Sequence, residues 1–142
     1  MKKFLFFLLM SLLVFTNIIV AQPPNMYNSQ WKVDKVEVVD GIISQTQLQD
    51  DDNMMLSFSP KGGEVNFVMI VKMKPSSISS IQLYKEVTEW MGSDDGDYWT
   101  RYYRTEDDMF VSIMVIESNK IVFKVSKDDQ SFIYTGRFWR YL

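Results

Sequence analysis

Two residue types are missing from this sequence of 142 residues, which contains no cysteine and no histidine. Without cysteine the chain can form no disulfide and can carry no lipid on a cysteine, so its stability has to come from an apolar core. Without histidine, catalysis by a Ser-His or Cys-His pair is excluded, as is ligation of zinc or haem by histidine. These absences favour a protein that is not an enzyme and that holds no cofactor and no metal.

Basic residues are few relative to acidic ones, with 15 lysines and arginines against 18 aspartates and glutamates and a net charge of -3. A surface of this sign repels phosphate groups. We therefore expect no nucleic-acid partner.

Residues 1–21 read MKKFLFFLLMSLLVFTNIIVA, a basic start followed by an apolar stretch and a small final residue. This pattern is typical of a secretory signal peptide. The alternative is an N-terminal membrane anchor, because the apolar stretch approaches the lower limit for a spanning helix. We expect cleavage, which removes two of the 15 basic residues and leaves 13 against 18 acidic ones, a net charge of -5. The mature protein would be secreted or periplasmic and would have no stable membrane anchor.

After this segment, residues 22–30 form a short polar lead-in and residues 31–142 read as a single domain. Short runs rich in valine, isoleucine, aromatics and methionine alternate there with turn residues, a pattern typical of β-strands. Because the connections are short, neighbouring strands should be antiparallel. The expected strands are residues 31–39, with a bulge near Asp34-Lys35, and residues 54–60, 64–73, 97–106, 108–117, 120–126 and 131–142.

Residues 79–91, SSIQLYKEVTEWM, fit two structures. Ser79, Gln82 and Gly92 supply the start and stop signals of a helix, whereas the surrounding strands favour another strand. As a strand, the segment completes about eight strands, enough for an all-β, antiparallel up-and-down meander closed into a barrel. As a helix, it gives an α+β roll with the helix packed on a curved sheet.

Alternation within the strands predicts which side chains face the core. Residues on one face of the expected strand 64–73 include Phe67 and Met69. In the C-terminal strands the predicted inward residues are Val111, Ile113, Val115, Ile121, Phe123, Val125, Phe132, Tyr134 and Phe138.

Ser29-Gln30-Trp31 opens the first expected strand, and the last expected strand carries Arg137 and Arg140. With the signal peptide and the meander, these features resemble small bacterial lipocalin-like proteins of the calycin type. In that family a Gly-x-Trp motif opens the first strand, and a basic residue of the last strand packs across the tryptophan and closes the barrel. The resemblance implies closure by Trp31 with Arg137 or Arg140, pairing of the first strand with the last, and binding of a small apolar molecule in the barrel.

A ligand pocket inside such a barrel would be lined by apolar side chains with a few polar groups. If Tyr102 and Arg104 point inward, they could orient a polar head group, while Phe67, Met69, Phe123 and Tyr134 line the apolar part. The leading hypothesis is therefore an exported, non-enzymatic protein that binds a small apolar or amphipathic ligand.

The alternative is a protein-interaction or structural module whose barrel is filled by its own side chains. Its working surface would then be an exposed aromatic patch, with Trp90, Trp99 and Trp139 as candidates.

Acidic clusters such as Asp50-Asp51-Asp52 lie where turns are expected, and we interpret them as solvated turns. Asp94, Asp95 and Asp97 offer oxygens to calcium, but the spacing lacks the EF-hand pattern, so an Asp/Gly turn is favoured there too.

Overall fold

The computed structural model describes residues 22–61 and 64–142. The expected signal peptide and residues 62–63 of the expected hairpin turn lie outside this part of the chain. The described residues are organised around one long strand, β1 (Ser29–Asp40), which pairs with β11 (Gln130–Tyr141) along its whole length. The predicted pairing of the first strand with the last is thus confirmed.

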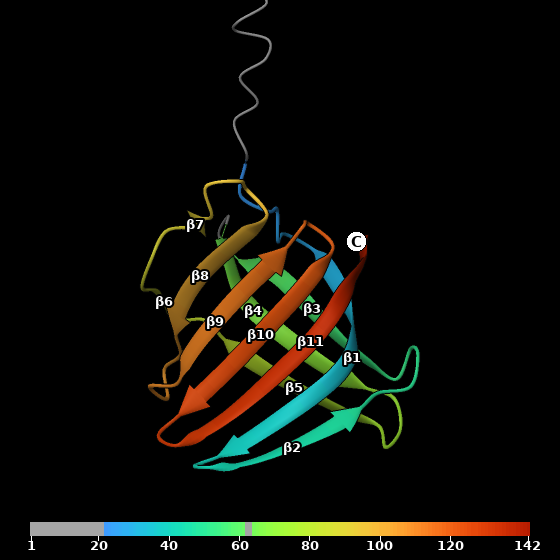
Figure 1. Cartoon of the computed structure of the whole chain (residues 1–142). Helices are drawn as coiled ribbons and strands as arrows, with labels where there is room; N and C mark the ends of the chain where they lie inside the picture. Colours follow the sequence, from blue (N-terminus) through green and yellow to red (C-terminus); the bar gives the residue numbers. More distant parts are fainter. Residues whose placement is uncertain (1–21, 62–63) are drawn as a thin grey trace, which may run out of the picture.

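Nine further strands complete an all-β, antiparallel sheet, in the order β5-β4-β3-β1-β11-β10-β9-β8-β6, with β2 beside β1 and β7 beside β8. They are β2 (Ile43–Leu48), β3 (Met54–Lys61), β4 (Glu64–Lys72), β5 (Ser77–Gln82), β6 (Lys85–Glu86), β7 (Met91–Gly92), β8 (Tyr98–Arg104), β9 (Phe110–Ile116) and β10 (Lys120–Lys127). Figure 1 shows β8 to β11 and β1 side by side, with β3, β4 and β5 behind them. The described residues contain no helix, and hence none long and apolar enough to cross a membrane.

Closure into a barrel is where the structure departs from the prediction. The ends of the sheet path, β5 and β6, follow each other in sequence across Leu83-Tyr84, yet within the described residues they do not pair. Leu83, the residue after β5, is buried in the core. The backbone N–H of Tyr84, the residue before β6, donates to the carbonyl of Arg104 on β8. Residues 79–91 are therefore extended rather than helical, but they are broken into short pieces that leave the sheet open.

The core lies between the two halves of this folded sheet. Phe58 of β3 meets Phe123 of β10 edge-on, with ring centroids 5.9 Å apart, and Phe123 also contacts Tyr134 of β11. The alternation predicted for β9 and β10 is confirmed, since Val111, Ile113, Val115, Ile121, Phe123 and Val125 are all buried. Tyr134 and Phe138 pack against this core, whereas Phe132, although predicted to face it, is 40% exposed near the start of β11.

Two strands present the opposite face to the one predicted. In β4 the buried residues are Val68 and Ile70, so Phe67 and Met69 point away from the core. In β8 the buried residue is Tyr103, so its neighbours Tyr102 and Arg104 also lie on the outer face. A shift of one residue exchanges the two faces of a strand completely, and both segments carry large side chains at odd and even positions alike.

The inner face of β8 instead carries Arg101, whose side chain is only 15% exposed and forms an ion pair with Glu86. Its Nε atom donates to the carbonyl of Thr88, and its guanidinium lies 5.4 Å from the ring centroid of Tyr103. These contacts fasten residues 86–88 to β8. Burial raises the pKa of Tyr103 to about 12, with nearby Arg101 acting in the opposite direction.

The pairing of β1 with β11 is interrupted by two bulges. Gln30 pairs with Arg140 and Trp31 with Phe138, so Trp139 is an extra residue on β11; Asp34 is likewise the extra residue on β1, between Val33 and Lys35. The bulge predicted near Asp34-Lys35 is confirmed. Between the two bulges the backbones come so close that a Cβ built at Gly136 would overlap with the carbonyl oxygen of Lys32. Glycine is required there by space.

Replacing Gly136 with alanine should therefore lower the free energy of unfolding by roughly 2–3 kcal/mol, the cost of forcing backbone apart in a packed site. Urea unfolding of both proteins measures the loss. Gly92→Ala is the matched control, because a Cβ there meets only the Trp99 ring, at 3.0 Å, and a side chain can move more readily than backbone. Equal stability of Gly136→Ala and the parent protein would contradict the close approach.

Tyr103 should make stability fall as the pH rises from 10 to 12. The unfolded chain loses the tyrosine proton near pH 10, whereas the folded protein keeps it until about pH 12, so the folded state binds more protons in this window. The expected loss across it is about 2–3 kcal/mol, and Tyr103→Phe should remove most of it. Urea unfolding at a series of pH values tests this, with exposed Tyr98→Phe as control; an unchanged pH slope in Tyr103→Phe would disprove it.

Candidate binding groove

A hollow of about 390 Å³ lies where β1, β3, β4 and β11 meet. This volume falls within the range of small-molecule sites, roughly 300–1,000 Å³. We call it the Trp139 groove. Its lining residues are Lys32, Asp52, Asn53, Met54, Met55, Val71, Met73, Trp139 and Arg140.

The strand register places the apolar floor of the groove on the outer face of the sheet. Val71 of β4 is paired with Met55 of β3, and Met55 is paired with Lys32 of β1. Their sequence neighbours Ile70, Leu56 and Trp31 are buried on the core side. The floor is thus made by outward-facing side chains, and a ligand reaches it without opening the core.

Trp139 forms the wall of the groove on β11 and is 40% exposed. It is the bulged residue of β11, and a β-bulge redirects the side chain that it carries. Two cations lie near its indole ring. The guanidinium of Arg140 is 3.9 Å from the ring centroid and the Lys32 Nζ atom is 5.0 Å from it. Such cation–π contacts attract both cations to the Trp139 ring and so favour this arrangement of the three side chains.

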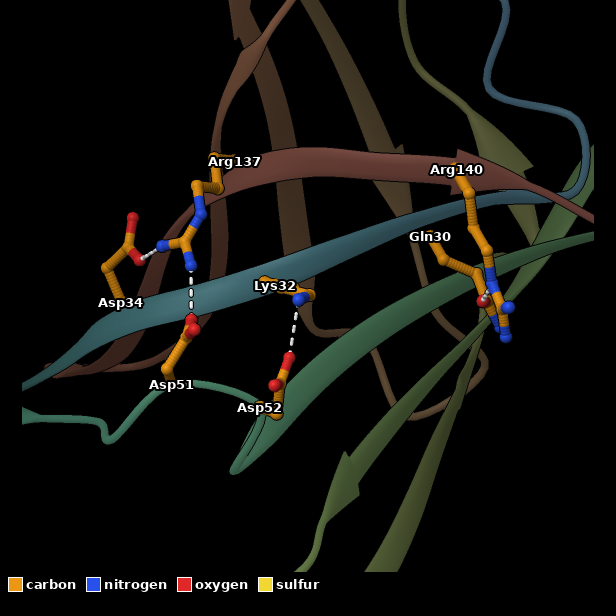
Figure 2. Close-up of polar contacts among 7 residues, drawn as sticks. All are labelled: Gln30, Lys32, Asp34, Asp51, Asp52, Arg137 and Arg140. Carbon is orange, nitrogen blue, oxygen red and sulfur yellow. Dashed lines mark hydrogen bonds and ion pairs between the residues drawn. The ribbon is translucent and has the colours of Figure 1, made fainter.

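Figure 2 shows a row of ion pairs along β1 and β11, of which Lys32 and Asp52 line the groove. Arg137 lies between Asp34 and Asp51 and bonds both, while Lys32 pairs with Asp52. The second bulge supplies Asp34, and the loop between β2 and β3 supplies the other two carboxylates. The acidic run 50–52 is therefore a turn, as predicted, but it also neutralises two cations of β1 and β11.

Asn53 fixes this loop against the end of β4. Its backbone carbonyl accepts a hydrogen bond from the N–H of Met73 (2.8 Å), and its Oδ1 atom accepts one from the N–H of Lys74 (3.0 Å). Its Nδ2 atom donates to Gln49 Oε1 at 3.2 Å. Met73 is thereby held at the rim of the groove.

Arg140 lies at the opposite end of the row in Figure 2, beside Gln30. Its Nε atom donates to Gln30 Oε1 at 2.8 Å, and Gln30 is itself buried, with its Nε2 atom 3.4 Å from Ser57 Oγ. Within residues 22–61 and 64–142 no carboxylate forms an ion pair with Arg140. The terminal nitrogens of this guanidinium have no acidic partner in the described protein.

The structure does not bring the six predicted ligand-binding residues together. Phe123 and Tyr134 belong to the core, whereas Phe67, Met69, Tyr102 and Arg104 lie on the outer face of their strands. Tyr102 stacks on Phe110 with centroids 5.2 Å apart, and Arg104 is paired with Asp108 at 3.0 Å. Phe67 lines a separate hollow of about 260 Å³.

The predicted contact of an arginine with Trp31 is replaced by an aromatic one. Trp31 is buried against Phe138, with ring centroids 5.3 Å apart at 76°, and its Nε1 atom donates to Ser29 Oγ at 3.0 Å. Arg137 and Arg140 instead belong to the row of polar contacts beside the groove. The sequence located the correct residues at the junction of β1 and β11 but assigned them the wrong partners.

The three tryptophans of the alternative surface patch lie in different settings. Trp90 packs against the core, 5.9 Å from the Arg101 guanidinium, and Trp99 lies against Gly92. Of these three tryptophans, Trp139 is the most exposed, so the structure offers a single exposed tryptophan in place of the expected patch of three.

The acidic turn at residues 93–97 satisfies its own polar groups. Asp95 Oδ1 accepts hydrogen bonds from Ser93 Oγ (2.6 Å) and from the N–H of Asp97 (3.1 Å). The bond from Ser93, followed by that from Asp97, lowers the pKa of Asp95, and the charge of Asp95 raises the pKa of Asp97. In the described part of the chain no group of three or more acidic side chains is arranged to hold a metal ion.

Comparison of the sequence with protein-family models and with curated proteins, and of the fold with solved structures, gave no match.

Proposed function

We propose that this chain is an exported, non-enzymatic, lipocalin-like protein that binds a small amphipathic ligand in the Trp139 groove. The observation that carries the proposal is the combination, in one hollow of about 390 Å³, of an apolar floor with a tryptophan wall and a cationic rim. Met55, Val71 and Met73 would contact the apolar part of a ligand, and methionine side chains adapt their shape to different ligands.

The inner side of the sheet is less suited to an amphipathic ligand. Phe58 and Phe123 are fully buried and in contact with each other, so they occupy the space between the two halves of the sheet. The inward-facing arginine, Arg101, is already paired with Glu86. A polar head group entering there would have to displace an ion pair whose arginine side chain is only 15% exposed, which is costly.

Binding is favoured over catalysis by the side chains of the groove. Its described lining includes no serine, threonine or tyrosine hydroxyl, and its one amine, Lys32, is paired with Asp52. Export is supported by residues 1–21 alone, and the lipocalin-like assignment by the antiparallel sheet in which β1 joins β11 beside the buried Trp31.

Trp139→Ala should weaken binding of ten-carbon probes, decanol and decanoate, at least tenfold, because it removes the wall of the groove and the surface on which Arg140 is stacked. Isothermal titration calorimetry gives the affinities, and native mass spectrometry gives the number of bound molecules. Tyr98→Ala is the matched control, since it removes an exposed aromatic side chain from β8 at a distance of several strands.

Two results would contradict the proposed function. One is a parent protein that binds neither probe. The other is a Trp139→Ala protein with a near-native melting temperature that binds both probes as tightly as the parent does.

A further inference from the structure

We infer that the Trp139 groove is selective for single-chain anionic amphiphiles, whose carboxylate is bound by the terminal guanidinium nitrogens of Arg140. This inference rests on the proposed function and specifies the class of ligand that the groove takes. Three observations support it: the ion-pair partners of the four arginines, the contacts that fix the position of Arg140, and the net charge of the groove.

Arg140 differs from the other three arginines of the sequence. Arg101 is paired with Glu86, Arg104 with Asp108, and Arg137 with Asp34 and Asp51. Arg140 instead donates one hydrogen bond, from its Nε atom to the amide oxygen of Gln30. The other three arginines of this acidic chain are paired with carboxylates. Arg140 is not, and it lines the Trp139 groove together with Trp139.

The Arg140 guanidinium is held in place before any ligand arrives. Its central carbon lies over the Trp139 ring, 3.9 Å from the centroid, and its Nε atom is hydrogen-bonded to the buried Gln30. The two terminal nitrogens then remain as parallel donors, the geometry that matches both oxygens of a carboxylate. A preorganised donor pair loses little conformational entropy on binding.

The charges of the groove favour an anion. Lys32 and Asp52 neutralise each other, and Arg140 leaves the described lining with one net positive charge, in a chain whose net charge is -3. A cationic head group would meet Arg140 and Lys32 beside the same indole ring. A neutral hydroxyl head group can accept a hydrogen bond from one of the free donors but brings no negative charge to Arg140.

The position of the apolar floor fixes where the chain of the ligand lies. Met55 belongs to β3, Val71 to β4, and Met73 directly follows β4; all three line the groove together with Trp139 and Arg140. A head group on Arg140 therefore places the tail across these side chains. The hollow of about 390 Å³ lies near the lower end of the range for small-molecule sites, which favours a ligand with one unbranched chain.

The test compares three probes with the same ten-carbon tail: decanoate, decanol and decyltrimethylammonium. By calorimetry at neutral pH, decanoate should bind the parent protein at least tenfold more tightly than decanol, since a charge-assisted hydrogen bond is worth about that factor or more. Decyltrimethylammonium should bind more weakly than either. The advantage of decanoate should vanish as its carboxyl group is protonated below about pH 5.

Arg140→Gln should reduce decanoate affinity at least tenfold, so that the ratio of decanoate affinity to decanol affinity falls to about one. Arg140→Lys should restore part of the difference, because it keeps the charge but loses the paired donors. Arg104→Gln is the control with the same change in net charge, at an arginine already paired with Asp108.

Equal affinities of decanoate and decanol for the parent protein would overturn the inference while leaving the proposed function intact. Decanoate selectivity that persists in a folded Arg140→Gln protein would overturn the role of Arg140. If that variant does not fold, the comparison of probes and the pH dependence of decanoate binding by the parent protein decide the question. Failure of all three probes to bind would instead contradict the proposed function.

Discussion

The close antiparallel contact between β1 and β11 is the constraint on which the rest of the structure depends. At Gly136 the two backbones leave no room for a Cβ, and the strands accommodate this contact with an extra residue on each, Asp34 and Trp139. The resulting bend lets β1 pair with β3 near its start and with β2 near its end. One strand thereby joins the two halves of the sheet that enclose the core. The same bulges bring Asp34 to Arg137 and Trp139 to the groove.

Electrostatic pairing then determines what the groove can bind. The loop that returns from β2 to β3 brings Asp51 and Asp52 to Arg137 and Lys32, and so it neutralises two of the four cations that β1 and β11 carry. Exposed ion pairs of this kind add little stability. They leave Arg140 as the arginine without a carboxylate, beside Trp139 and an apolar floor, and the proposed selectivity rests on this arrangement.

Much of this fold could be predicted from the sequence, and the errors have physical causes. The all-β class, the bulge near Asp34 and the inward faces of β9 and β10 follow from alternation of apolar residues and from turn residues. The faces of β4 and β8 do not, because Phe67, Val68, Met69 and Ile70 are all apolar and residues 101–104 place an arginine and a tyrosine at both parities. The uncharged segment 43–48 has no such alternation, so β2 was not predicted. The groove depends on register and on ion pairs between residues far apart in sequence, such as Arg137 with Asp51, which local patterns do not encode.

The central claim is that this protein binds its ligand on the outer face of the sheet and not between its two halves. Titration of the ¹⁵N-labelled protein with decanoate, followed by two-dimensional NMR, tests this most directly. The account predicts that the largest chemical-shift changes fall on the Trp139 indole N–H and on the backbone amides of Lys32, Met55, Val71 and Arg140. Changes concentrated instead on Phe58, Phe123 and Tyr134, with the Trp139 signal unmoved, would place the ligand inside the sheet and contradict the account.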